Sequence, residues 1–144
     1  MGQHSGPNNR RARPLLERAS SLDPQFAEAK AWLAMNLNFG WMYCYEPDCR
    51  PRVQALAESA IELDPENADA HVILGYVRIF NGSAALDQGS RSFKRALQIN
   101  ANHADAWLFM ADLGVLEGEA ESALQCAANA FRLNPHPPQY YYWL

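Results

Sequence analysis

The chain has 144 residues, of which 49% are hydrophobic and 19% are charged, and its formal net charge is −4. These values are ordinary for one globular domain and argue against general nucleic-acid binding, which needs a basic surface to displace phosphate counterions. No apolar run approaches the roughly 18 to 20 residues of a membrane span, so no membrane-spanning segment is expected within these residues.

The cysteines and histidines carry no metal, redox or cofactor signature. Cys44 and Cys49 are five residues apart, which fits neither a C-x-x-C redox pair nor half of a zinc site. Cys126 and the four histidines lie singly along the chain. We therefore expect no metal ion and no cofactor, and we interpret the cysteines as small apolar side chains.

In chain order, residues 1–10 are expected to be disordered or frayed, and a repeating pattern follows them. Four segments share an alanine and a closing polar corner: LLERASSLDP (15–24), LAESAIELDP (56–65), SFKRALQINA (92–101) and CAANAFRLNP (126–135). Their alanines at positions 19, 60, 96 and 130 are 41, 36 and 34 residues apart. A period in this range indicates a repeat architecture.

A second pattern follows each of the first three segments: AEAKAWLAMNL (27–37), ADAHVILGYVR (68–78) and ADAWLFMADLG (104–114). Its small residues Ala34, Gly75 and Ala111 are again 41 and 36 apart, and its apolar residues have helical spacing. Each repeat is therefore predicted to be two antiparallel helices. The Asp-Pro or Asn-Pro pair ends the second helix, because proline has no N–H to donate.

The predicted fold class is all-α, a solenoid of antiparallel helix pairs with about seven to eight helices. Residues 11–144 form a single domain. Its parts are the second helix of a truncated repeat (11–24), a repeat with a long insert (25–65), two complete repeats (66–101 and 102–135) and the start of another truncated repeat (136–144).

This pattern resembles the tetratricopeptide repeat (TPR), a 34-residue helix–turn–helix unit. The copy from Ala101 to Pro135 matches best, and the family's positions are filled there by Trp107, Ala111, Gly118, Ala123, Ala130 and Pro135. The resemblance implies a superhelix whose first helices line a concave groove, where a peptide or a partner helix binds.

If the family geometry holds, three rows of residues line that groove. They are Glu28, Ala31, Met35, Asn38 and Phe39; then Asp69, Val72, Tyr76, Ile79 and Phe80; then Asp105, Leu108, Asp112 and Val115. The lining is apolar with an acidic edge, so we expect a protein or peptide partner that is apolar or basic rather than acidic. No lysine or arginine pair stands there, apart from Arg78 nearby, so the carboxylate-clamp subclass is rejected.

The insert NFGWMYCYEPDCRPR (38–52) allows two interpretations. It could be a binding loop, since long insertions in solenoids often lie on a binding face. We favour the other interpretation, in which the first helix runs on by a turn or two and the aromatic side chains cap the adjacent repeat.

The candidates for an interface between copies are Trp41, Tyr43, Tyr140, Tyr141, Tyr142 and Trp143. The alternative for the aromatic tail is that it packs on Leu124, Ala127 and Phe131 of the preceding helix. In the first case the repeats would form a homodimer and bring attached output domains together.

The insert and the closing LNPHPPQYYYWL are similar to the C-terminal repeat regions of bacterial class III adenylate/guanylate cyclases, and to repeats attached to winged-helix transcriptional regulators. This resemblance implies a sensory or regulatory region of a larger signalling protein, in the cytoplasm, or in the periplasm if the parent protein spans a membrane. No nucleophile elbow, phosphate-binding glycine loop or H-E-x-x-H motif is present, so we predict that the chain is not an enzyme.

Overall fold

The computed structural model describes residues 6–42, 47–138, 141 and 142. Within these residues the chain forms seven α-helices and no strand. The helices are α1 (Gly6–Leu22), α2 (Ala27–Met42), α3 (Arg50–Leu63), α4 (Ala68–Ile79), α5 (Leu86–Ile99), α6 (Ala104–Glu117) and α7 (Ala120–Leu133), and a short 3-10 turn, η1 (Ser83–Ala85), precedes α5. The predicted all-α class is confirmed.

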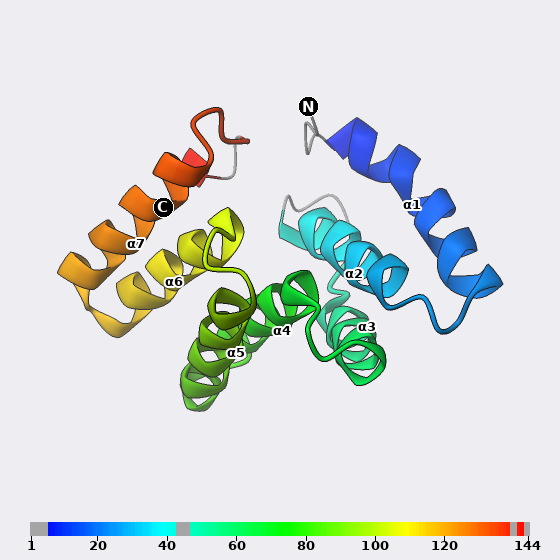
Figure 1. The fold of residues 1–144 in the computed structure, drawn as a ribbon, viewed down its shortest axis with the longest axis horizontal. Coiled ribbons are helices and arrows are strands. Elements are labelled where there is room, and N and C mark those ends of the chain that lie inside the picture. Colours follow the sequence, from blue (N-terminus) through cyan, green and yellow to red (C-terminus); the bar gives the residue numbers. More distant parts are fainter. Residues whose placement is uncertain (1–5, 43–46, 139–140, 143–144) are drawn as a thin grey trace.

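The helices follow an arc with two rows (Figure 1). The inner row consists of α2, α4 and α6, which contact one another in that order, and the outer row consists of α3, α5 and α7. Successive helices pack as the pairs α2–α3, α4–α5 and α6–α7, while α1 packs on α2. This arrangement is the predicted solenoid of helix pairs.

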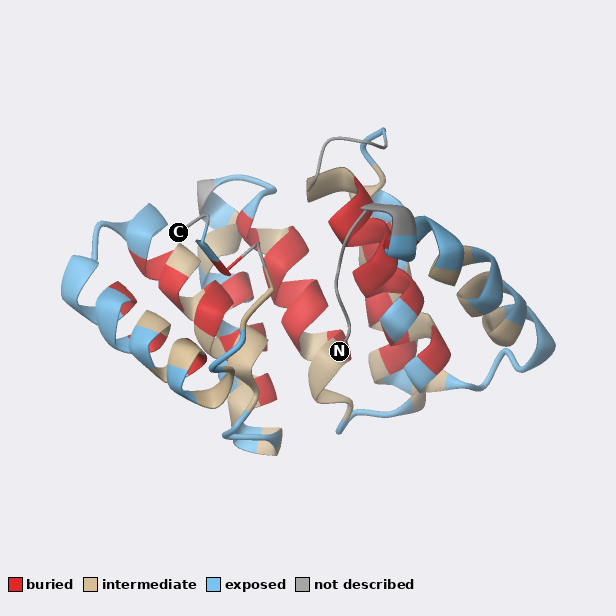
Figure 2. Cartoon of the chain, turned by 90° about the horizontal axis from the view of Figure 1, so that it is seen from above, coloured by how far each residue is buried: buried red, intermediate tan, exposed pale blue. Residues whose placement is uncertain are grey.

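The core lies between the rows, and Figure 2 shows buried residues gathered along the central helices. Small residues allow α4 and α5 to approach each other closely. A Cβ added at Gly75 would lie 2.6 Å from Cε1 of Phe93 and 3.1 Å from the carbonyl oxygen of Gly89. Phe93 is fully buried, and its ring occupies the space that a methyl group at position 75 would need.

The corners between repeats share one hydrogen-bonded turn. Oδ1 of Asp64 accepts a hydrogen bond from the Glu66 N–H at 3.1 Å, in the corner that contains Pro65. In the corner where Ala101 replaces proline, Oδ1 of Asn100 accepts the same bond from the Asn102 N–H at 3.0 Å. The Asp or Asn side chain therefore shapes the turn in both cases.

The structure differs from the sequence prediction at residues 6–10, which were expected to be frayed but belong to α1. Asn9 is 6% exposed, and its Nδ2 donates to the carbonyl oxygen of Asn36 at 2.7 Å. Nε of Arg13 donates to Oδ1 of Asn36 at 2.8 Å. These bonds hold α1 on α2 from its first turns, a polar attachment that apolar periodicity does not reveal.

The insert begins with a longer first helix, because α2 continues to Met42 before α3 starts at Arg50. Trp41 packs edge-on against Phe80 of the next repeat, with ring centroids 5.8 Å apart. The Arg50 guanidinium lies 5.0 Å from the centroid of the Trp41 ring. Trp41 thus caps the adjacent repeat, while Tyr43 lies outside the described residues.

The C-terminal segment differs from the expected start of another helix. Among the described residues after Leu133, which are 134–138 with 141 and 142, no α-helix occurs. Tyr141 is nevertheless 1% exposed and belongs to the main core cluster.

Candidate functional site

The predicted groove positions share one face of each inner helix. On α4, for example, Asp69, Val72, Tyr76 and Ile79 are spaced three, four and three residues apart, which places them in line. The same spacing recurs on α2 and α6. We call this side of α2, α4 and α6 the inner face, and it consists of the fourteen positions predicted from the sequence.

Most of the positions on the inner face are buried. The buried side chains are Ala31, Met35, Asn38, Phe39, Val72, Tyr76, Ile79 and Leu108. The contacts of α2 with α4 and of α4 with α6 help to explain this burial, since large side chains fill the space between neighbouring helices. A partner cannot reach them unless the side chains rearrange.

The accessible part of the inner face is acidic, with two apolar side chains. Phe80 is 40% exposed and Val115 is 63% exposed. The carboxylates of Asp69, Asp105 and Asp112 are half-buried. Glu28 is also exposed, so every ionisable group at these positions that is exposed or half-buried is an acid.

Asp69 is paired with a histidine of the next repeat. Nε2 of His103 lies 2.9 Å from Oδ1 of Asp69, and Nδ1 of His103 accepts a hydrogen bond from the Ala106 N–H at 3.3 Å. Because Nδ1 is the acceptor, the ring proton is on Nε2, which donates to Asp69. The histidine therefore caps α6 and satisfies Asp69 at the same time.

Asp105 is paired with the C-terminal segment. The hydroxyl of Tyr141 donates to Oδ1 of Asp105 at 2.7 Å, and its ring packs edge-on against Phe131 at 5.7 Å. Burial, followed by the charge of Asp105, raises the pKa of Tyr141. Tyr141 is thus enclosed by its own chain instead of forming an open interface surface.

The other interface candidates have different surroundings. Tyr142 is 67% exposed, although its ring contacts Phe131 with centroids 5.7 Å apart. Trp41 is half-buried against Phe80. Tyr43, Tyr140 and Trp143 lie outside the described residues.

Asp112 has no hydrogen bond or ion pair among the described residues. Burial raises the pKa of its carboxyl from 3.8 to about 6. Burial and then the charge of Asp112 raise the pKa of Tyr76. Tyr76 also packs against Phe109 at 4.4 Å and Phe80 at 5.0 Å between ring centroids.

Sequence reasoning placed Asp112 on this face but missed its isolation. A signal was present, because the residues three and four positions away on α6 are Leu108, Phe109, Val115 and Leu116, none of them basic. A carboxylate with apolar neighbours on its own helix can pair only with a cation from another helix or loop. The sequence alone does not show whether the fold places such a cation beside it.

Two buried asparagines on α2 behave differently. Asn36 is fully engaged, since its Nδ2 donates to Oδ1 of Asn9 at 2.7 Å and its Oδ1 accepts from Arg13. Asn38 is 0% exposed, and its Nδ2 lies 3.5 Å from Sδ of Met42. Its Oδ1 has no hydrogen-bond partner among the described residues, an unusual state for a buried acceptor.

Other site types find no support in the part of the chain that the structure describes. There, no three His, Cys, Asp or Glu side chains are grouped so that they could hold a metal ion. None of the helices described is both long enough and apolar enough to cross a membrane.

No protein-family model matches the chain, and no curated protein matches it either. Several solved structures do match. TTC0263, a thermophilic TPR protein in Thermus thermophilus, is 22% identical with a TM-score of 0.74 over 90% of this chain and 68% of that chain. A crystal structure of MamA is 17% identical with a TM-score of 0.62 over 90% of this chain and 70% of that one. At these identities the likeness concerns the fold, and the fold of this chain is therefore that of a TPR solenoid.

Proposed function

We propose that the chain is a protein-interaction module that binds a segment of a partner protein on its inner face. The observation that carries this proposal is the character of the accessible inner face: carboxylates at Glu28, Asp69, Asp105 and Asp112, with no lysine or arginine at the fourteen positions. Exposed Phe80 and Val115 add apolar contact area. A partner segment with apolar and basic side chains complements such a surface.

The finer role that we propose is the sensory or regulatory repeat region of a larger bacterial signalling protein, similar to an adenylate cyclase. The residue patterns of the insert (38–52) and of the closing LNPHPPQYYYWL (133–144) support this role, and the described structure does not bear on it. In such a protein the module acts by binding and not by catalysis, in the cytoplasm or, if the parent protein spans a membrane, in the periplasm.

The binding proposal is tested with a phage-displayed library of random dodecapeptides, selected on the wild-type chain at pH 7.5. Val115 lies on the inner face and Leu124 on the outer helix α7, and both are strongly exposed apolar residues. Val115→Lys should weaken the selected peptides about tenfold, since it removes apolar contact and repels a basic ligand. Leu124→Lys adds the same charge elsewhere and should have little effect.

Two results would contradict the proposal. In the first, the library yields no peptide that binds the chain. In the second, Leu124→Lys weakens the peptides as much as Val115→Lys does, which would move the binding surface off the inner face. Tyr76→Ala is unsuitable as the main variant, because Tyr76 is 5% exposed and its loss would disturb the core.

A second candidate function is homo-oligomerisation that brings attached output domains together. It is favoured by an exposed apolar stripe on α7, where Leu124 is 72% exposed and lies two turns from Phe131. Tyr142, which contacts Phe131, extends the stripe and is 67% exposed. Exposed apolar surface of this kind is a common feature of association sites.

A further inference from the structure

Asp112 stands apart from the other aspartates of the inner face. Asp69 accepts a hydrogen bond from His103, and Asp105 accepts one from Tyr141. Asp112 is half-buried and has no such donor among the described residues. A carboxylate that has lost part of its water without gaining a partner is unfavourable, and proteins retain few of them outside binding or catalytic sites.

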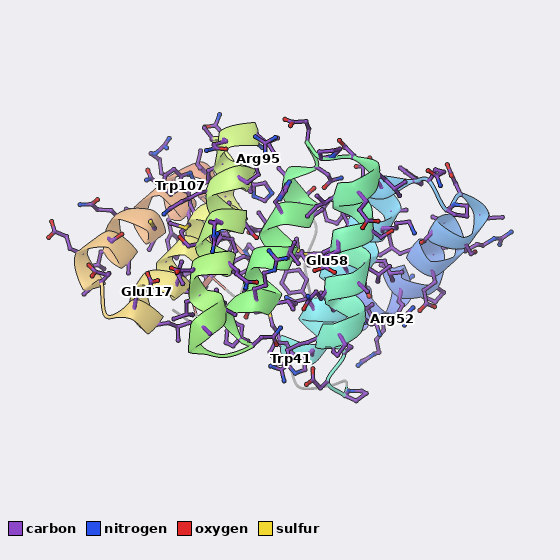
Figure 3. All side chains as sticks on the ribbon, turned by 90° about the horizontal axis from the view of Figure 1, so that it is seen from below. Trp41, Arg52, Glu58, Arg95, Trp107 and Glu117 are labelled. Atoms are coloured by element: carbon purple, nitrogen blue, oxygen red, sulfur yellow. The ribbon has the colours of Figure 1, made fainter. Side chains whose placement is uncertain are left out.

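Among the described residues no cation pairs with Asp112, and two arginines of the neighbouring helices pair with other acids. Arg78 of α4 lies 3.5 Å from Glu58 of α3, and Arg95 of α5 pairs with Glu66. Figure 3, seen from the side of the outer helices, labels Glu58 and Arg95 on that side of the molecule. These two ion pairs therefore lie away from the inner face.

The side chains around Asp112 suit both parts of a long basic side chain. Val115 is one turn further along α6 and is 63% exposed, so it can contact an aliphatic stem. Phe80 packs on Tyr76 with ring centroids 5.0 Å apart and is 40% exposed, so it offers an accessible aromatic face on the same surface. Lysine and arginine combine an apolar stem with a cation that binds carboxylates and aromatic rings.

We propose that Asp112, together with the exposed Phe80 and Val115 of the inner face, is the anchor for a lysine or arginine side chain of the partner segment bound there. This inference rests on the proposed function and names the chemical group that the site selects. The cation pairs with the Asp112 carboxylate, and its stem lies along Val115.

The test uses the peptides selected on the wild-type chain and the variant Asp112→Asn, which keeps the shape and removes the charge. Glu117→Gln is the matched control, because Glu117 is an exposed acid at the end of the same helix (Figure 3). Peptides enriched in lysine or arginine should bind Asp112→Asn about tenfold more weakly than the wild type, whereas Glu117→Gln should change affinity less than about twofold.

A double-mutant cycle identifies the anchored residue. Each basic residue of a selected peptide is replaced by glutamine, and affinity is measured for the wild type and for Asp112→Asn. One replacement should weaken binding to the wild type about tenfold and leave binding to Asp112→Asn nearly unchanged.

The anchor is overturned if Asp112→Asn binds as tightly as the wild type, if every peptide replacement is additive with it, or if the selected peptides carry no basic residue. In those cases a loss of binding in Val115→Lys would still support the inner face as the binding surface. If Val115→Lys also binds normally, the proposed function fails together with the anchor. Circular dichroism spectra confirm that each variant remains helical.

Discussion

At the scale of single residues, the protonation of Asp112 makes the free energy of unfolding depend on pH. Its pKa is raised by burial from 3.8 to about 6, so the folded chain binds more protons than the unfolded chain between these values. The free energy of unfolding therefore contains a contribution from Asp112 that decreases as the pH rises from about 4 to about 6. Above pH 6 the folded state carries the cost of an ionised, poorly solvated carboxylate.

Asp112→Asn should accordingly be more stable than the wild type at pH 7.5, by about 1 to 2 kcal/mol after allowance for residual solvent access, and equally stable near pH 4. Urea unfolding of both proteins across this pH range measures the difference. Glu117→Gln serves as the control and should show no such pH-dependent gap. A difference that stays constant with pH, or an Asp112→Asn variant less stable at pH 7.5, would argue against a raised pKa.

Residue-level burial is where sequence reasoning was weakest. Helical spacing identified which side of each helix Met35, Asn38 and Ile79 occupy, but it does not measure how closely the neighbouring helices approach. That approach depends on pairs such as Tyr76 and Phe109, which are 33 residues apart in the chain and belong to different repeats. Helical spacing therefore groups these positions on one side of each helix and does not give their accessibility.

At the scale of helices, the sequence and the structure make opposite predictions for Gly75. The equivalent positions of the other repeats are Ala34 and Ala111, and alanine favours a helix over glycine by about 1 kcal/mol, so sequence comparison predicts a stabilising Gly75→Ala change. The structure predicts a loss, because the new Cβ would lie 2.6 Å from Cε1 of Phe93. Phe93 is fully buried and has little space to move.

Gly75→Ala should lower the free energy of unfolding by about 1 to 3 kcal/mol, the usual cost of overpacking a core. Thermal and urea unfolding measure it. Gly75→Ala combined with Phe93→Leu should lose less than the sum of the two single changes, because the smaller side chain makes room for the methyl group. Gly75→Ala with wild-type or higher stability would mean that α4 and α5 separate more easily than their packing suggests.

Helix ends that depend on neighbouring residues can be predicted from the sequence, whereas ends that depend on distant contacts cannot. The ends of α3, α5 and α7 depend on the local Asp-Pro, Asn-Ala or Asn-Pro corner, and the sequence placed them within a residue or two. The start of α1 depends on contacts of Asn9 with Asn36, which are 27 residues apart. Local signals were therefore read correctly, while a boundary set by a distant polar contact was missed.

At the scale of the whole molecule, Tyr141 adds its ring to the core beside the helix pair α6–α7. Tyr141 is 1% exposed, packs on Phe131 and bonds to Asp105 of α6, so it joins the last helix pair to the segment that follows it. Tyr142, its neighbour in sequence, is 67% exposed. Substituting the two tyrosines one at a time therefore separates a contribution to stability, expected of Tyr141, from a contribution to association, expected of Tyr142.

Tyr141→Ala should lower the free energy of unfolding by about 3 kcal/mol, since it removes a buried ring and the hydrogen bond from its hydroxyl to Asp105. Tyr142→Ala should change stability by less than about 0.5 kcal/mol, because most of its ring is already in water. Urea unfolding measures both, and light scattering over a range of concentrations gives the mass of each variant. Equal losses in the two variants would contradict a core role for Tyr141. A wild-type dimer that Tyr142→Ala converts to monomers, with stability otherwise unchanged, would instead favour the tail as the homodimer interface, because only the exposed ring is available to a second copy.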